Sequence, residues 1–517
     1  MTAEYRRSRV PELQAVMKLA QDAARTVLKE WELQPDPKLQ IEGGIVLPSA
    51  ELYKAQQVLL ACTGKMTELV IEPQGRLQEV SGQFMESRAL HICAEHRIAD
   101  LLDESGEGGL HVEKLGPMVG IDSWKLARIL RCLNAIHVFR EIGPNVFANN
   151  NVSSALVRNE PLRAYMMIYG LHLYSASDWL PSTLTDPTFG PSYDIALTAL
   201  QPAVGTSKSE WEWLEEKIPE ETKDFGRQGY VGALAAEAGS STNGNTNGTN
   251  LNPAGYTNGD NVNNGTNGTS RTNGSTESAN GTNGTSHAVN RKTKPRPELA
   301  LFGLAMQGGG KVHGTAHLYD YPWESLGEAI LVDVAGGVGG FGLQLTKLYP
   351  KLQYTVQDRP DVVKQGHGVW MKENPDAIAQ GQVKLTPHDM FSPQPIVGAD
   401  VYWLRYIIHD WSDDYCVQIL SALAPAMREN SRVLIADQVM NTTFGDPQIP
   451  SAPSPLPANY GYHKRYSHQR DLVMMASLNG IERTPAQLDS IVTRAGLKIA
   501  KIWECRSQVG IVECRLA

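Results

Sequence analysis

The 517-residue sequence contains few cysteines, and their spacing argues against disulfide and zinc chemistry. The six cysteines are scattered along the chain, and no two of them form a Cys-x-x-Cys pair. Disulfide-stabilised small domains and zinc clusters both need several cysteines at short spacings. The His, Asp and Glu residues show no metal-ligand spacing either. We therefore expect reduced thiols and no metal site.

Two further absences bear on location and partners. No uninterrupted apolar run is long enough to cross a bilayer, and the residues after Met1 lack the apolar core of a signal peptide. The net charge is −9 and long runs of Lys and Arg are absent, which disfavours nucleic acids and anionic membranes as partners. We expect a cytoplasmic protein that binds neither nucleic acid nor membrane.

One segment has almost no large apolar side chains. Between Gly239 and Asn290 the chain repeats Asn, Gly, Thr and Ser. Such a composition cannot bury enough surface to offset the entropy cost of ordering. We interpret residues 239–296 as a disordered insertion. Its Asn-x-Thr/Ser matches would be glycosylation acceptors only in a secreted protein.

The part of the chain before this insertion has helical patterns followed by a hairpin pattern. Apolar residues in Ser123–Leu133 recur at the spacing of one helix face, after a shorter helix pattern at His111–Val119. Val138–Ala148 then alternates and turns like a small hairpin. This order predicts a winged helix over residues 81–170, after a helical extension over residues 1–80. DNA binding is an alternative for this domain, although a basic surface signal is lacking.

Strands and helices alternate in the second half of the chain, which indicates a mostly parallel, doubly wound α/β sheet. Two final apolar runs, Leu497–Trp503 and Val509–Cys514, are joined by a short turn, which permits only antiparallel pairing. We expect a Rossmann-like sheet that ends in an antiparallel hairpin. The strands expected before that hairpin are Ile330–Val334, Leu352–Gln357, Val383–Thr386, Ala399–Leu404 and Arg432–Ala436.

A glycine-rich loop follows the first of these strands. The segment Ala335–Gly342 permits a tight turn and lets a ligand approach the backbone where the next helix starts. Asp358 ends the second strand, where a carboxylate can accept hydrogen bonds from ribose hydroxyls. Gly337, Gly339 and Gly342 also fit G-x-G-x-x-G, so a nicotinamide dinucleotide is an alternative to a nucleoside methyl donor. The terminal hairpin favours the methyl donor.

Three titratable residues follow strands or stand before a helix at the expected ligand edge. The strand before His409 delivers this imidazole to its carboxyl end, and Ser412 then suits the N-cap of a helix. Asp437 ends another buried strand. Glu482 lies just before a helix that Thr484 can cap, and capping does not need it. A histidine with a carboxylate beside it is suited to general base catalysis.

An ordered set of segments carries a resemblance to a known family. Together these segments span about residues 299–517, and they resemble the plant caffeate and flavonoid O-methyltransferases of the class I, cation-independent type and their relatives in fungal secondary metabolism. The winged helix resembles the dimerisation domain of that family more weakly. The matching segments are Leu331–Gly339, Gln357–Pro360, His388–Phe391, Leu404–Trp411 and Asn479–Thr484.

The resemblance implies an S-adenosyl-L-methionine-dependent O-methyltransferase that acts as a homodimer on a hydroxyl of a small aromatic or polyketide-type metabolite. His409 would be the base, flanked by Asp437 and Glu482. Helices over residues 171–238 would belong to the substrate domain, and residues 297–517 would bind the donor. The implied donor-binding residues are Gly337, Asp358, Asp389, Met390 and Arg405, and the implied substrate residues are Met306, Met475 and Asn479.

The sequence departs from the family pattern at three positions. Ala335 replaces the usual first glycine of the cofactor loop, Asp437 stands where Glu is frequent, and Arg405 takes the place of a Lys. None of these changes removes a required functional group. The alternative is a pericyclase of the same fold that binds S-adenosylmethionine without transferring its methyl group.

Overall fold

The computed structural model describes residues 7–33, 47–220 and 292–517. Of the insertion predicted to be disordered, residues 239–296, positions 239–291 lie outside these residues. Its last residues are described, and Thr293–Pro295 form a strand, because they pair with Lys217–Pro219. Lys217–Lys294 is assigned to a unit separate from the rest of the chain. Where the described chain stops and resumes, β4 (Lys217–Pro219) pairs with β5 (Thr293–Pro295).

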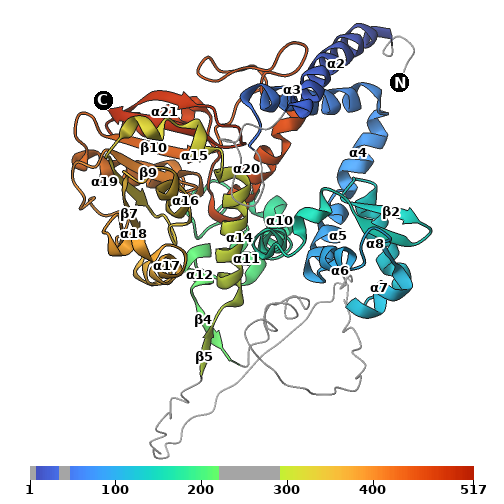
Figure 1. Ribbon diagram of the computed structural model, residues 1–517, viewed down its shortest axis with the longest axis horizontal. Coiled ribbons are helices and arrows are strands. Elements are labelled where there is room, and N and C mark those ends of the chain that lie inside the picture. The colour runs from blue at the N-terminus through green and yellow to red at the C-terminus, as the bar shows by residue number, and fades with distance from the viewer. Residues whose placement is uncertain (1–6, 34–46, 221–291) are drawn as a thin grey trace, which may run out of the picture. The chain divides into compact units, whose positions relative to one another are not determined.

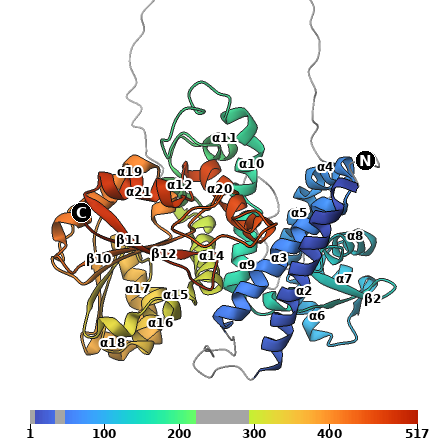
Figure 2. The same ribbon diagram turned by 90° about the horizontal axis from the view of Figure 1, so that it is seen from above.

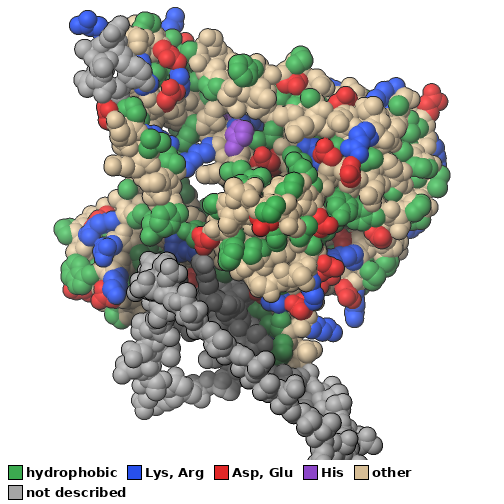
Figure 3. Space-filling model, turned by 180° about the vertical axis from the view of Figure 1, so that it is seen from behind, with side chains coloured by type: hydrophobic (Ala, Val, Ile, Leu, Met, Phe, Trp, Pro, Cys, Tyr) green, Lys and Arg blue, Asp and Glu red, His purple; other side chains and the backbone are tan. Residues whose placement is uncertain are grey.

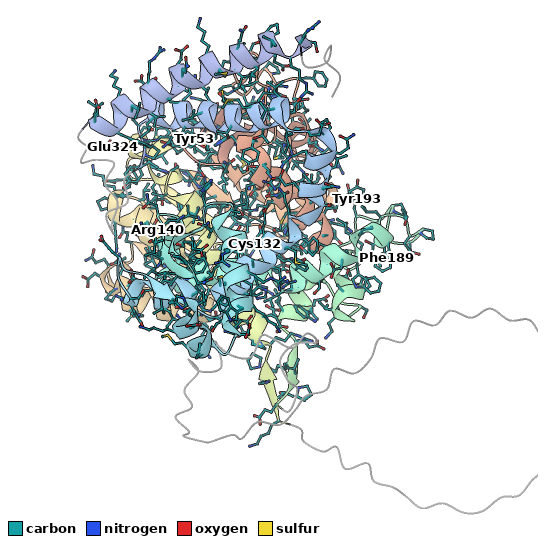
Figure 4. All side chains as sticks on the ribbon, turned by 90° about the vertical axis from the view of Figure 1, so that its right-hand side faces the viewer. Tyr53, Cys132, Arg140, Phe189, Tyr193 and Glu324 are labelled. Atoms are coloured by element: carbon teal, nitrogen blue, oxygen red, sulfur yellow. The ribbon has the colours of Figure 1, made fainter. Side chains whose placement is uncertain are left out.

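Two long helices begin the described chain. α2 (Val10–Glu32) and α3 (Ala50–Val70) pack side by side along a shared apolar face (Figure 2). α3 begins where the Ser49 hydroxyl accepts the Leu52 N–H at 3.0 Å. Tyr53 (Figure 4) donates its hydroxyl hydrogen to the Ser507 carbonyl at 2.6 Å, so α3 is tied to the last turn of the chain.

The predicted helix–helix–hairpin order is confirmed. α7 (Val112–Val119) and α8 (Ser123–Asn134) are followed by β2 (Phe139–Gly143) and β3 (Val146–Asn149). The apolar face of α8 is buried because it packs on the helices before it and on the hairpin. The other elements of this part are α4 (Pro73–Gly82), α5 (Phe84–Glu95), α6 (Ile98–Glu104), β1 (Leu110–His111) and η2 (Ser153–Leu156).

A group of helices connects this part to the large sheet. α14 (Pro297–Gly314) lies alongside α9 (Glu160–Tyr169). Glycine allows the close approach, because a Cβ on Gly308 would lie 2.2 Å from the Pro161 carbonyl oxygen. The remaining members are α10 (His172–Thr183), α11 (Leu200–Val204), α12 (Glu210–Leu214), α15 (His317–Asp320) and η3 (Trp323–Leu326).

The sheet has seven strands in the order β11-β12-β10-β9-β6-β7-β8 (Figure 1). The five strands from β10 to β8 are parallel, and β12 pairs antiparallel with β10 and with β11. This is the predicted parallel sheet with a terminal antiparallel hairpin. The strands are β6 (Ile330–Val334), β7 (Gln353–Asp358), β8 (Val383–Pro387), β9 (Val401–Arg405), β10 (Arg432–Asp437), β11 (Leu497–Trp503) and β12 (Gly510–Leu516).

Helices cover both faces of this sheet, which explains why its inner strands are continuous apolar runs. Alternate strand residues point to opposite faces, so Leu331 packs with one set of helices and Val332 with the other. The first set is α16 (Gly340–Leu348), α17 (Pro360–Glu373) and α18 (Pro375–Ala379), and the second is α19 (Asp413–Leu423) and α21 (Pro485–Arg494).

The predicted helix starts are only partly as expected. Thr484 and Gln487 form a reciprocal capping box at α21, so this prediction is confirmed. Ser412 holds the N-cap position of α19, but its side chain makes no capping hydrogen bond there. Asp413 and Asp414 still lie in the first turn of α19, where the helix dipole favours negative charge.

Candidate active site

A buried strand delivers His409 to the carboxyl edge of the sheet. β9 lies between β6 and β10 and is parallel to both, so the carboxyl ends of the three strands meet at one edge. After β9, Tyr406 adopts a left-handed backbone conformation with φ of 57°. η4 (Ile408–Asp410) follows and carries His409, of which 3% is exposed.

Two carboxylates hold the His409 imidazole, and a third holds its backbone. Nδ1 lies 2.8 Å from Glu482 Oε1, and Nε2 lies 3.2 Å from Asp410 Oδ1. Asp437 Oδ2 accepts the backbone N–H of His409 at 3.2 Å. The three residues predicted as a catalytic group therefore lie together, and Glu482 rather than Asp437 contacts the ring. Their catalytic roles stay predictions.

Glu482 reaches the imidazole because its loop packs on the backbone of His409. The Ile481 N–H donates to the His409 carbonyl at 2.8 Å. A Cβ on Gly480 would lie 2.3 Å from that same oxygen, so the close approach requires glycine. The Glu482 N–H donates to Asp471 Oδ1 at 2.8 Å, which fixes the loop from the other side.

Neighbouring charges set the protonation of this buried cluster. Burial opposes a charge on His409, but the Glu482 and Asp410 carboxylates outweigh it and raise the pKa of His409 to about 9. Burial raises the pKa of Asp410 to about 7 and also raises the pKa of Asp437. Burial alone would raise the pKa of Glu482, yet His409 and Arg470 hold it below its usual value. At neutral pH an imidazolium thus faces a carboxylate.

Two side chains that contact the imidazole lie outside the predicted site. Arg470 belongs to α20 (Arg465–Leu478), and its Nη2 lies 3.4 Å from Nδ1 and 3.3 Å from Nε2 of His409. Asp410 follows His409 directly in the chain, and this position could have indicated from the sequence that Asp410 belongs to the site. Arg470 lies in an ordinary helical pattern, which gives no such indication.

The glycine loop after β6 has an open approach to its backbone. Ala335, Gly337 and Gly339 are left-handed, with φ of 55°, 62° and 77°. A Cβ on Gly337 would meet nothing within 4 Å, and α16 begins just behind at Gly340. Such a turn can accept a ligand against its backbone at a helix N-terminus.

Asp358 lies across from this loop at the end of β7. Its Oδ2 accepts the Gly337 N–H at 2.8 Å and its Oδ1 accepts the Arg359 N–H at 2.7 Å. Each carboxylate oxygen has a second lone pair, so Asp358 can also accept hydrogen bonds from ribose hydroxyls. Burial raises the pKa of Asp358 although both backbone N–H groups oppose this.

The other predicted donor-binding residues follow neighbouring strands. Asp389 and Met390 come just after β8, where Asp389 Oδ1 accepts the Phe391 N–H at 3.1 Å. Arg405 ends β9, and its guanidinium carbon lies 5.1 Å from the ring centre of Phe341 in α16. These residues, with Gly337 and Asp358, follow adjacent strands at one edge. Their chemistry fits a nucleoside with a charged amino-acid tail.

The predicted substrate residues come from separate elements. Met306 in α14 is 43% exposed, and Met475 in α20 is half-buried. The Asn479 side-chain amide donates to the carbonyls of Asp194 and Leu197 at 2.8 and 3.1 Å. In this arrangement Asn479 anchors a neighbouring loop, and contact of the three residues with a substrate stays a prediction.

Comparison with known proteins gives a consistent assignment. A family described as the O-methyltransferase domain matches residues 272–498, and the O-methyltransferase dimerisation domain matches residues 78–159. O-methyltransferase tpcA of Aspergillus fumigatus is 48% identical over 499 residues, which cover 96% of this chain and 94% of that protein. O-methyltransferase gedA of Aspergillus terreus is 46% identical, with 95% and 93% covered. The chain belongs to the O-methyltransferase family.

This O-methyltransferase uses S-adenosylmethionine as its methyl donor, as its family does. The predicted family, enzyme class and cofactor are confirmed, and the nicotinamide alternative is wrong. The match to the dimerisation domain, residues 78–159, includes α5 to α8 and the β2–β3 hairpin.

A solved structure described as a pericyclic reaction enzyme shares the fold of this O-methyltransferase. The TM-score is 0.60 and the identity 17%, over 90% of this chain and 94% of that one. At this identity the likeness concerns the fold alone, so it does not separate methyl transfer from pericyclic chemistry. Among the described helices, none combines the length and apolar character needed to cross a membrane.

Proposed function

We propose that this O-methyltransferase methylates a phenolic hydroxyl of a small aromatic or polyketide-type molecule, with His409 as the base. The observation that carries the proposal is the buried His409–Glu482 pair. His409 follows β9, the strand next to β6, which leads into the cofactor loop. The pKa of His409, about 9, is close to that of a phenol such as tyrosine, about 10. Proton transfer from a phenol to this imidazole therefore costs little.

Each neighbour of His409 has a distinct task in this proposal. Glu482 accepts the Nδ1–H, which selects the tautomer and stabilises the imidazolium. Asp437 holds the backbone of His409. Nε2 takes the acceptor proton, and Asp410, 3.2 Å away, must give up this contact when the acceptor binds. Burial raises the pKa of Asp410 to about 7, so this carboxyl is partly protonated at neutral pH. A protonated carboxyl leaves the imidazolium more easily than a carboxylate does.

Binding residues supply the other part of the rate enhancement. S-adenosylmethionine, when bound, supplies a methyl group that its sulfonium makes electrophilic. Gly337, Asp358, Asp389, Met390 and Arg405 would hold the donor, and Met306, Met475 and Asn479 would line the acceptor side. Orienting two reactants in this way is worth roughly 7–11 kcal/mol.

We also propose that the enzyme is a homodimer. The match to a dimerisation domain over residues 78–159 supports this, as do apolar side chains exposed on α4 and α5 at the start of that range and just before it. Leu77 is 72% exposed, Phe84 52% and Met85 56%. Other apolar side chains are also exposed among charged ones, as one face of the molecule shows (Figure 3). Contiguous exposed apolar residues favour a subunit interface.

Replacement of His409 tests the catalytic role directly. We expect His409→Ala and His409→Gln to lower turnover of a phenol by about 10²–10⁴-fold, because the base is lost. Affinity for S-adenosylhomocysteine, measured by calorimetry, should change little. Turnover near that of the wild type would remove His409 from the mechanism.

Labelled donor distinguishes the alternative reaction. With S-adenosylmethionine isotopically labelled in its methyl group, a methylated phenol carries the label. A product that forms without the label would instead indicate pericyclic chemistry.

A further inference from the structure

Arg470 lies against the catalytic pair rather than at the surface. Only 9% of this residue is exposed. Its Nε lies 3.1 Å from Glu482 Oε1, and Nη2 is nearly equidistant from the two nitrogens of His409, at 3.4 and 3.3 Å. Equal distances place the guanidinium over the imidazole ring instead of in line with either nitrogen. Arg470 is therefore a fixed positive charge beside the base.

Arg470 and His409 share one carboxylate oxygen. The same carboxylate oxygen, Glu482 Oε1, contacts both Arg470 and His409. Within the described ranges, Glu482 is the only carboxylate that forms an ion pair with Arg470. When His409 is protonated, Glu482 therefore faces two cations, while Asp410 contacts His409 from its other nitrogen.

Phenolic side chains also lie close to Arg470. Its guanidinium carbon lies 4.8 Å from the ring centre of Tyr406, and Tyr165 and Tyr466 are also close enough to affect its charge. Tyr165 and Tyr466 hydrogen-bond to each other. None of these groups is an anion at neutral pH, so they do not neutralise the guanidinium.

Tyr406 provides an independent observation at the same place. Its hydroxyl is buried and has no hydrogen-bond partner among the described residues. Its backbone is left-handed, with φ of 57°, a conformation that is unfavourable for an aromatic residue. Burial raises the pKa of Tyr406 to about 12, against the opposing effect of Arg470 and Arg405, so the hydroxyl keeps its proton. A strained residue thus holds an unused hydrogen-bond donor beside the Arg470 guanidinium.

We infer that Arg470 and the Tyr406 hydroxyl form an anion-binding subsite that takes the oxygen of a phenolate acceptor beside His409. The inference rests on the proposed function and adds the charge state of the substrate to it. Guanidinium and hydroxyl donors are stronger toward an ionised oxygen than toward a neutral one. The subsite therefore selects acidic phenols over neutral alcohols. The competing explanation is that Arg470 only positions Glu482.

Light absorption by 4-nitrophenol separates these explanations, because its phenolate absorbs at longer wavelength than the neutral phenol. The probe is titrated into the full-length enzyme saturated with S-adenosylhomocysteine, at a pH below the pKa of the free probe. We expect the phenolate band to appear on binding to the wild type. Neutral 4-nitroanisole, which lacks the acidic proton, is the reference for binding that does not depend on charge.

Substitutions then assign the effect to the subsite. Arg470→Gln should weaken phenolate binding by about tenfold or more and leave 4-nitroanisole binding nearly unchanged. Arg470→Lys should keep part of the effect, and Tyr406→Phe should weaken it by a smaller factor. Arg465→Gln is the matched control, since Arg465 is on the same helix but bonds Gln83 and not the catalytic pair. S-adenosylhomocysteine affinity reports whether each variant is folded.

Two outcomes would overturn the inference. One is the absence of a phenolate band in the wild type. The other is a phenolate band of undiminished strength, either in folded Arg470→Gln or in both single variants Tyr406→Phe and Arg470→Lys. If Arg470→Gln does not fold, the Tyr406→Phe and Arg470→Lys results decide. No turnover is measured, so the result is independent of the His409 test of the proposed function.

Discussion

At the residue scale, the protonation of His409 controls when the enzyme can deprotonate an acceptor. The neutral imidazole is the base, whereas the Glu482 and Asp410 carboxylates favour the charged ring and raise its pKa to about 9. The free enzyme therefore holds a proton on His409 at neutral pH. A phenol that gives its proton to the neutral imidazole and a phenolate that binds the imidazolium form the same ion pair with His409.

The pH dependence of kcat/KM tests this assignment. Below pH 9 the neutral fraction of His409 falls about tenfold per pH unit, so kcat/KM should rise with pH and level off near that value. Glu482→Gln removes the largest influence that raises the pKa of His409, so the rise should move to lower pH and the plateau should be smaller. The measurement is kcat/KM between about pH 6 and pH 10.

A matched variant controls for a general effect of losing a carboxylate. Glu373 is exposed at the end of α17, so Glu373→Gln should leave the profile unchanged. If Glu482→Gln shows the same midpoint as the wild type, the carboxylate does not set the pKa of His409.

Ala335 is a second residue whose effect is local. It holds φ of 55°, and a left-handed conformation costs an L-residue about 1–2 kcal/mol. Ala335→Gly should relieve this strain. The larger conformational entropy of glycine in the unfolded chain opposes the gain by about 0.4–1 kcal/mol. We expect equal or slightly higher thermal stability and undiminished S-adenosylhomocysteine affinity, measured by melting and calorimetry.

Gly337→Ala is the matched opposite change in the same loop. A Cβ there meets nothing within 4 Å, so only the backbone strain at φ of 62° is added. This variant should be less stable than the wild type by about 1–2 kcal/mol. A loss of stability in Ala335→Gly equal to that in Gly337→Ala would contradict the strain argument.

At the scale of elements, the active site is the meeting of two loops. The loop that contains η4 follows β9, and the loop before α21 lies on it through the Ile481 N–H and the bare Cα of Gly480. The carboxylate of Glu482 is thereby held at 2.8 Å from Nδ1 of His409. Small shifts between these loops alter the pair directly, because no other described carboxylate hydrogen-bonds Nδ1.

Gly480→Ala tests this contact. The new Cβ would lie 2.3 Å from the His409 carbonyl oxygen, so the loops must separate. We expect a loss of about 1–3 kcal/mol in stability and at least a tenfold loss of turnover, because misplacement near 1 Å is that costly. Donor affinity should stay near the wild-type value, since the donor site lies on other loops.

Gly368→Ala is the control for this substitution. Gly368 is in α17, where a Cβ meets nothing within 4 Å, and alanine is a better helix former than glycine. Its stability should be unchanged or higher and its turnover normal. Normal turnover in Gly480→Ala would show that the contact is not needed to place Glu482.

At the scale of the whole molecule, the apolar surface of α4 and α5 bears on assembly. Leu77 and Met85 are more than half exposed, at 72% and 56%. Met85 lies within the range matched by the dimerisation domain, residues 78–159, and Leu77 lies one residue before it. We expect Leu77→Glu with Met85→Glu to weaken dimerisation by about tenfold or more, since charges in a buried interface are costly. Light scattering coupled to size-exclusion chromatography measures the mass.

Phe444→Glu serves as the control for surface charge. Phe444 is 97% exposed but lies outside the dimerisation domain, so its replacement should leave the mass unchanged. A double variant at Leu77 and Met85 that keeps a dimeric mass would show that this surface is not the interface.

The sequence by itself determined the elements and their order. Each expected strand of the large sheet is present, with ends that differ by at most two residues. This success has a physical reason, because strands covered on both faces must be continuous apolar runs, and the glycine loop and the capping box at Thr484 are set by nearby residues. The edge at which His409, Asp437 and Asp358 gather also follows from parallel strands alone.

Only the tertiary structure decided which side chains touch. Asp437 and Glu482 both lie near His409, but loop packing brings the Glu482 carboxylate, 73 positions away in the chain, into contact with the imidazole. Arg470, 61 positions from His409, joins the pair because α20 passes over it. Asn479 donates its amide to Asp194 and Leu197 across a still longer separation. Such contacts depend on the relative placement of loops, which local periodicity does not encode.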